Sequence, residues 1–165
     1  YVRYALHVHD YTLGLARVTE APQLAAMSRR FIEHGLAPSC PAARIISHIR
    51  HAESLVLAAR REHQVIGFAV MQFGEDRAHL NLLAVALEHR RRGIARRLLT
   101  WLEESAVTAG TFVISLELRA INTEAFAFYS ALGYHEVRRI DGYYQGVEQA
   151  IRMSRDLSLV TANRS

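Results

Sequence analysis

The chain has 165 residues, 50% of them apolar, which is a typical size for one domain with a single hydrophobic core. Twenty basic residues against sixteen acidic ones give a formal net charge of +4, and all twenty are arginine. The absence of lysine excludes a phosphate-binding loop of the GxxxxGK[ST] type and a Schiff-base lysine, because both need an ε-amine. A single cysteine, Cys40, excludes an internal disulfide and a multi-cysteine zinc site.

No stretch reaches the ~18 apolar residues that a membrane helix needs, so we expect no membrane partner. Residues 1–10 lack a starting methionine and an apolar signal core, and we treat them as an N-terminal extension of unknown function. We expect a single domain over residues 11–158 and a tail over residues 159–165. The lone cysteine and the lack of an export signal favour a cytoplasmic location.

Apolar periodicity and turn residues predict the elements in chain order. They are a strand at 13–18, helices at 22–35 and 41–49, strands at 55–59, 65–73 and 78–87, a helix at 93–110, a strand at 112–119, a helix at 123–132 and strands at 134–140 and 149–154. The strands between 55 and 87 form an antiparallel meander. This order predicts one α+β (mixed α/β) domain without internal repeats.

The strand at 78–87 leads through a run of arginines to Gly93 at the start of a helix. A helix start points unpaired N–H groups outward and carries about half a positive charge, to which the arginines add. Gly93 permits close backbone approach and Ala95 keeps a second position small, which indicates a phosphate site. The alternatives are a solvated arginine face or a nucleic-acid patch. Because like charges at a positive helix end are unfavourable, we favour a phosphate ligand.

Glu117 lies in the middle of the strand at 112–119. Strand alternation places Ser115, Glu117 and Arg119 on one face and the apolar residues on the other. Burial of the Glu117 carboxylate would raise its pKa toward neutrality, which suits a general base. The alternative is an ion pair with Arg119 or with a neighbouring strand.

Two residues of the next helix have ordinary structural interpretations. Asn122 stands at the helix entrance, where N-capping is its commonest role. Tyr129 falls on the apolar side, where a core aromatic with a hydrogen-bonded hydroxyl is usual. Neither His7 with His9 nor His48 with His51 has a third ligand at useful spacing, so we expect no metal.

Two segments resemble the GNAT superfamily of N-acetyltransferases. Leu83-Ala84-Val85 followed by Arg90-Arg91-Arg92-Gly93-Ile94-Ala95 is similar to its acetyl-CoA motif, (Q/R)xxGx(G/A). Residues 116–134 resemble a second signature, LEVRxxNxxAxxxYxxxGF. Residues 138–153 are similar to the tail of the bacterial ribosomal-protein alanine N-acetyltransferase subgroup. There, Ile140-Asp141-Gly142 lengthens the spacing and Gln149 replaces an aspartate.

The resemblance implies a fold and a site. The fold is a central mixed, mostly antiparallel sheet of about seven strands flanked by about four helices, with a β-bulge in the strand at 78–87. Glu117 is the general base and Tyr129 the acid, while Tyr143 and Tyr144, unless they are ordinary strand aromatics, line the acceptor site with the loop at 35–41. The residues expected to bind acetyl-CoA are Leu83, Ala84, Val85, Arg91, Arg92, Gly93, Ile94, Ala95, Arg96 and Asn122.

The implied reaction is acetyl transfer from acetyl-CoA to a primary amine, without a metal. We expect the acceptor to be the N-terminal amine of a protein or peptide. The alternatives are a small amine, such as an antibiotic or polyamine, and a non-catalytic acyl-CoA sensor. A nucleic-acid partner is not expected, and a homodimer is left open.

Overall fold

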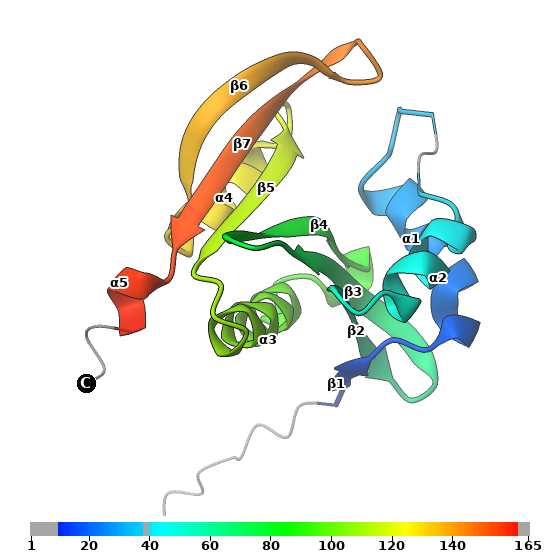
Figure 1. The fold of residues 1–165 in the computed structure, drawn as a ribbon. Helices are drawn as coiled ribbons and strands as arrows, with labels where there is room; N and C mark the ends of the chain where they lie inside the picture. The colour runs from blue at the N-terminus through cyan, green and yellow to red at the C-terminus, as the bar shows by residue number, and fades with distance from the viewer. Residues whose placement is uncertain (1–9, 38–39, 162–165) are drawn as a thin grey trace, which may run out of the picture.

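The computed structural model describes residues 10–37 and 40–161. A seven-stranded sheet runs through the molecule in the order β1-β2-β3-β4-β5-β7-β6 (Figure 1). Its strands are β1 (Thr12–Leu15), β2 (Ser54–Arg61), β3 (Gln64–Phe73), β4 (Arg77–Val85), β5 (Val113–Arg119), β6 (His135–Tyr144) and β7 (Glu148–Asp156). Neighbouring strands pair antiparallel, except that β4 and β5 are parallel. The expected mixed, mostly antiparallel sheet is therefore confirmed.

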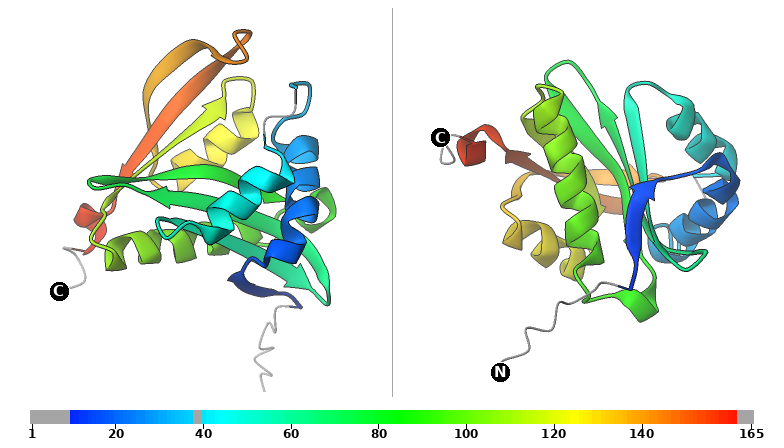
Figure 2. Two further views of the ribbon diagram at one scale, coloured as in Figure 1. Left: turned by 45° about the vertical axis from the view of Figure 1, so that its right-hand side comes forward. Right: turned by 90° about the horizontal axis from the view of Figure 1, so that it is seen from below.

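Helices cover both faces of the sheet (Figure 2). On one face lie α1 (Ala21–Phe31) and α2 (Ala42–Arg50), and on the other lie α3 (Ile94–Thr108) and α4 (Thr123–Ala131). A short helix, α5 (Ser158–Thr161), follows the last strand. None of the helices in the described ranges combines the length and the apolar character needed to span a bilayer.

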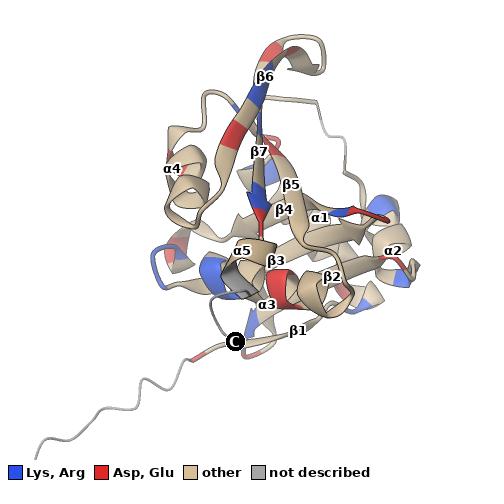
Figure 3. Ribbon diagram, turned by 60° about the vertical axis from the view of Figure 1, so that its left-hand side comes forward, with Lys and Arg blue, Asp and Glu red and all other residues tan. Residues whose placement is uncertain are grey.

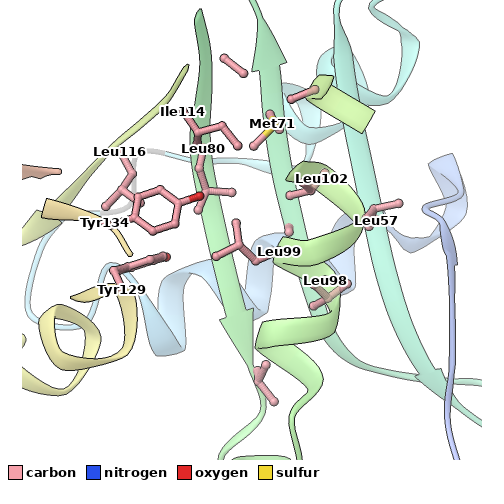
Figure 4. Close-up of a cluster of buried hydrophobic side chains, with 14 of the residues drawn as sticks. Leu57, Met71, Leu80, Leu98, Leu99, Leu102, Ile114, Leu116, Tyr129 and Tyr134 are labelled. Carbon is pink, nitrogen blue, oxygen red and sulfur yellow. The ribbon is translucent and has the colours of Figure 1, made fainter. Parts of the chain in front are cut away.

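Each face of the sheet has its own core. In α3, Ile94, Leu98 and Leu102 recur at four-residue spacing and are fully buried. The helix packs against β2, β3 and β4, with Leu98 and Leu102 facing the sheet (Figure 4). The central strand β3 is buried from Val65 to Met71 and contributes to both cores. A strand covered on both sides must be apolar on both faces, which explains this continuous run.

Several predicted boundaries differ from the structure. The first strand ends at Leu15, and Val18–Glu20 forms a 3-10 turn. Helix α1 ends at Phe31 rather than at Gly35, because the N–H groups of residues 32 and 33 both donate to the Ser28 carbonyl and loosen the last turn. Most of the predicted N-terminal extension and of the predicted tail lies outside the described residues.

The strand at 78–87 is also shorter than predicted. It ends at Val85, and Leu87–His89 is a second 3-10 turn that turns the chain toward α3. Conversely, β6 continues to Tyr144, beyond the predicted end at residue 140. The extension passes through a bulge, since Ile140 faces Ala150 while Tyr144 faces Glu148. Four residues of β6 thus span two of β7, and a local sequence pattern does not reveal such a mismatch.

Candidate active site

Strands β4 and β5 part in the middle of the sheet. Leu80 faces Met71 on β3 and Leu82 faces Val70, so Asn81 is an extra residue on β4. This confirms the β-bulge implied by the family resemblance. Parallel pairing of β4 with β5 is confined to residues 77–80 and 113–116. Beyond it, the segment Leu83–Val85 pairs only with β3 among the described strands, which leaves its other backbone edge available to a ligand.

The loop after β4 leads into the start of α3, which has no side-chain cap. Gly93 is the N-cap of α3 with a left-handed φ of 78°, and no side chain caps the helix. A Cβ built on Gly93 would meet no atom within 4 Å, so the space beside this backbone is open. Arg91 also has a positive φ, 59°. The outward N–H groups and open surroundings fit the predicted anion site.

Three of the five arginines around this loop have internal partners. The Arg90 side chain donates from Nε to the Val85 carbonyl, 3.2 Å away. Arg92 pairs with Asp10, and the guanidinium groups of Arg92 and Arg97 lie 5.7 and 5.1 Å from the centre of the Tyr11 ring. Sequence reasoning set Asp10 aside as part of the extension and missed this contact.

Arg91 and Arg96 are exposed, and within the described ranges they have neither a hydrogen bond nor an ion pair. The basic loop and the first turn of α3 stand together in Figure 3. The guanidinium groups of Arg91 and Arg96 therefore remain available to an anionic ligand. Arg92 is also predicted to bind the diphosphate, but its guanidinium group is already paired with Asp10.

Glu117 is held between two basic side chains from neighbouring strands. One carboxylate oxygen accepts from His79 on β4, and the other accepts from Arg152 Nε on β7 at 2.8 Å. The Glu117 side chain is 7% exposed. Burial raises the pKa of Glu117, but the hydrogen bonds and charges of His79 and Arg152 outweigh burial, so the pKa is lowered. The predicted upward shift is wrong, and the cross-strand ion pair is the interpretation that holds, with Arg152 in place of Arg119.

His79 also contacts its own strand. Its Nδ1 lies 2.8 Å from Asn81 Oδ1, and Asn81 Nδ2 donates to Gln72 Oε1 on β3 at 2.8 Å. The hydrogen bond with Glu117 raises the pKa of His79 against the opposing effect of burial, and the contact with Asn81 raises it further. Sequence reasoning missed His79 and Arg152. The available signal was a histidine and an asparagine at alternate positions of an otherwise apolar strand.

Tyr129 occupies the core beside α3. It is 8% exposed, and its ring packs edge to face against Phe128 and Tyr134 at centroid distances of 5.1 and 5.6 Å (Figure 4). Burial, and then the neighbouring Tyr144, raise the pKa of Tyr129. Its hydroxyl therefore stays protonated at any physiological pH. The structure supports the core-aromatic interpretation and also provides a proton donor.

Tyr143 and Tyr144 are adjacent aromatic residues near the end of β6. Their rings contact each other edge to face at 5.0 Å. Burial raises the pKa of both phenols, and the negative charge of Glu117 raises both further. Tyr144 also raises the pKa of Tyr129. The role of Tyr143 and Tyr144 at the acceptor site stays a prediction.

The tip of the β6–β7 hairpin is tied to the connection after α1. Gln145 donates from Nε2 to the Ala37 carbonyl at 2.5 Å and accepts from the Ala37 N–H at 3.0 Å. Arg119 makes a two-pronged ion pair with Glu148 at 2.6 and 2.5 Å and donates to the His34 carbonyl. These two segments approach each other in Figure 1. The turn that follows Tyr143 and Tyr144 thus contacts Ala37 of the loop at 35–41, and the role of the two tyrosines as a wall of the acceptor site stays a prediction.

Asn122 caps α4 as the sequence predicts. Its Oδ1 accepts from the Ala125 N–H at 3.0 Å. The amide nitrogen is left over for a further hydrogen bond, so the predicted contact with the cofactor stays a prediction.

The sheet, its bulge and the arginine loop define the class. This chain belongs to the acetyltransferase (GNAT) family, whose model matches residues 21–134, and is an N-acetyltransferase. Over 108 residues, or 64% of this chain and 73% of the relative, it is 36% identical to the ribosomal protein bS18-alanine N-acetyltransferase of Salmonella typhimurium. It is 39% identical over 70 residues to the N-terminal acetyltransferase B complex catalytic subunit naa20 of Schizosaccharomyces pombe, covering 42% of this chain and 39% of that one.

A solved structure is similar over nearly the whole chain. The crystal structure of the ribosomal-protein-S18-alanine N-acetyltransferase from Escherichia coli superposes with a TM-score of 0.77 at 27% identity, covering 89% of this chain and 94% of that chain. The family and the fold are therefore established together.

Proposed function

We propose that this protein transfers the acetyl group of acetyl-CoA directly to the α-amine of a polypeptide N-terminus. The observation that carries the proposal is the Glu117 carboxylate, ionised between His79 and Arg152 with a lowered pKa. An α-amine has a pKa of about 7.7–8.0, against about 10.4 for a lysine side chain. An α-ammonium therefore gives up its proton to a carboxylate more readily than a lysine side chain does. The named activities of the two relatives support the same acceptor class.

Acetyl-CoA fits the parted strands and the open helix start. The unpaired edge of Leu83–Val85 offers backbone groups to the amides of the pantetheine arm. The N–H groups that follow Gly93, with the free side chains of Arg91 and Arg96, bind the diphosphate. Asn122 hydrogen-bonds the cofactor or orders a water beside it. Ile94 and Ala95 bring the first turn of α3 against this site.

Transfer needs a neutral amine, a polarised carbonyl and a protonated leaving group. Glu117, directly or through one water, accepts the ammonium proton, and the amine then forms a C–N bond with the thioester carbon. A backbone N–H near Val85 stabilises the oxyanion. The C–S bond breaks as Tyr129 gives its proton to the departing sulfur, the nitrogen gives its second proton to solvent to leave the neutral amide, and solvent reprotonates Tyr129. Holding both substrates side by side supplies much of the acceleration without a covalent enzyme intermediate.

The acceptor end is formed by the two adjacent tyrosines and the described residues after α1. Tyr143 is 44% exposed, so one of the two rings remains open to a bound peptide. The ties from Gln145 to Ala37 and from Arg119 to His34 join the two sides of this end. A chain terminus is the part of a polypeptide that enters such a bridged site with the least rearrangement.

A thiol-release assay tests the proposal. Acetyl-CoA is incubated with a pool of short peptides bearing free N-termini or with a pool of small amines, and free CoA is measured. Turnover with the peptide pool supports the proposal, whereas turnover confined to the small amines overturns the acceptor class.

Glu117→Gln tests the base in the same assay, and we expect kcat to fall by on the order of 10²–10⁴-fold. Glu103→Gln is the matched control. Glu103 is also a half-buried carboxylate ion-paired to an arginine, Arg155, but it lies on α3 and is not part of the proposed site. Full turnover of Glu117→Gln would remove Glu117 from the mechanism.

A further inference from the structure

A line of polar side chains crosses four strands of the sheet beside the proposed base. It runs from Gln72 on β3 through Asn81 and His79 on β4 to Glu117 on β5, and ends at Arg152 on β7. Gln72 is exposed at one end and Arg152 is 30% exposed at the other, whereas Glu117 between His79 and Arg152 is only 7% exposed. Of the side chains in this line, only Glu117 takes part in the catalytic steps described above. Asn81 and Gln72 have no assigned role.

The hydrogen bonds fix the protonation of the imidazole. Asn81 donates with its amide nitrogen to Gln72, which leaves its carbonyl oxygen facing His79 Nδ1 at 2.8 Å. An amide oxygen only accepts, so Nδ1 carries a proton. The Glu117 carboxylate also only accepts, so Nε2 carries the second proton. With the amides of Asn81 and Gln72 in this orientation, His79 is an imidazolium, in line with its raised pKa.

The bulge in β4 places Asn81 for this task. Residues two apart on a strand share a face, so Asn81 and His79 point to the same side of the sheet. Asn81 is the extra residue between the pairs of Leu80 with Met71 and of Leu82 with Val70, and a bulge bends and twists its strand locally. The bulge that parts β4 from β5 thus also supplies the amide that contacts His79.

We propose that Asn81, oriented by Gln72, is a positioning residue that keeps His79 doubly protonated against Glu117 and thereby keeps the Glu117 carboxylate ionised and aimed at the acceptor amine. This inference rests on the proposed role of Glu117 as the base. Besides each other, the ionisable groups that act on His79 or Glu117 are Arg152 on β7 and Tyr143 and Tyr144 on β6.

Removing the Asn81 oxygen removes one of two acceptors that stabilise the charged ring. When the imidazolium then loses a proton, it loses the one on Nδ1, because Nε2 still donates to Glu117. Glu117 is left with a single full cation, Arg152, and becomes more basic. The neutral ring, no longer held by Asn81, also fixes the direction of the Glu117 carboxylate toward the acceptor amine less firmly.

Nuclear magnetic resonance titration of the His79 ring proton tests the proposal, with the signal assigned by its loss in His79→Gln. Asn81→Leu should lower the titration midpoint, and Asn81→Asp, which keeps an acceptor of the same shape, should raise it. Gln72→Leu removes the group that orients Asn81 from an exposed position and should also lower the midpoint. We expect Asn81→Leu to reduce kcat about tenfold with little change in KM for acetyl-CoA, and Asn81→Asp to retain turnover.

An unchanged His79 midpoint in Asn81→Leu would overturn the proposal. Should that variant fail to fold, an unchanged midpoint in Gln72→Leu would do the same, because Gln72 lies on the surface. Glu117→Gln distinguishes a failure of the proposed base from a failure of the proposed positioning role. Full turnover of Glu117→Gln defeats the proposed base, whereas an inactive Glu117→Gln beside an unperturbed Asn81→Leu defeats the positioning role alone.

Discussion

Gly93→Ala tests whether the start of α3 binds the diphosphate. Gly93 has a φ of 78°, and a methyl group built there meets no atom within 4 Å. The substitution therefore costs only the strain of a left-handed alanine, about 1–2 kcal/mol. Gly110, beyond the other end of α3, has a φ of 80° and equally open surroundings. Gly110→Ala is the matched control.

The two variants should lose the same stability and differ in ligand affinity. For a chain of this size, 1 kcal/mol shifts Tm by about 2–4 °C, so each Tm should fall by roughly 2–8 °C. The methyl of Gly93→Ala enters the space where the diphosphate approaches the backbone. Losing one charged hydrogen bond there costs about 1.5–3 kcal/mol, which weakens CoA binding about 10- to 100-fold.

Isothermal titration calorimetry with CoA and thermal unfolding supply the two quantities. Gly110→Ala should bind CoA like the wild type, despite its equal strain. Equal CoA affinity of Gly93→Ala and Gly110→Ala would refute the assignment of the diphosphate to this loop.

Three further predictions concern the acid, the core and the pH dependence. Tyr129→Phe fills the same buried space without a proton to donate, so steady-state kinetics should show kcat falling by on the order of 10²-fold at unchanged CoA affinity; an unchanged kcat would remove Tyr129 as the acid. Leu102 is fully buried, so Leu102→Ala should cost about 3–5 kcal/mol in urea unfolding, and a cost below about 1 kcal/mol would contradict the packing. Glu117 raises the pKa of His79, so the imidazolium stabilises the fold fully below its unfolded pKa of about 6.5, and this contribution is lost as the pH rises through the higher folded value. The stability difference between wild type and His79→Gln should accordingly shrink as the pH rises from about 6, and a difference that grows would contradict the ion pair.

Local patterns predicted the elements well. Four-residue spacing identified α3, and alternation with turn residues identified the strands, because each depends on residues close in sequence. The family motifs correctly predicted the bulge in β4, whereas the roles of Glu117 as base and Tyr129 as acid stay predictions. Element ends were less accurate, since the last turn of α1 is decided by where the N–H groups near Ser28 find an acceptor.

The electrostatics of the site could not be read from one strand. Alternation put Glu117 on a face, but its partners come from strands 38 and 35 residues away in sequence. The pKa of Glu117 was therefore predicted to shift in the wrong direction. Arg92 was expected to bind diphosphate, and its pairing with Asp10 joins residues 82 positions apart. Local periodicity does not reveal the register between distant strands. It also does not reveal contacts with the N-terminal extension, which the sequence analysis did not use.

Tandem mass spectrometry of one acetylated peptide tests the central claim most directly. The peptide carries a free N-terminal alanine and an internal lysine, and it is incubated with acetyl-CoA and the protein. The proposed mechanism predicts that the acetyl group appears on the α-amine, because an α-ammonium gives up its proton to Glu117 more readily than a lysine side chain does. An acetyl group on the lysine side chain, or an unmodified peptide, would contradict it.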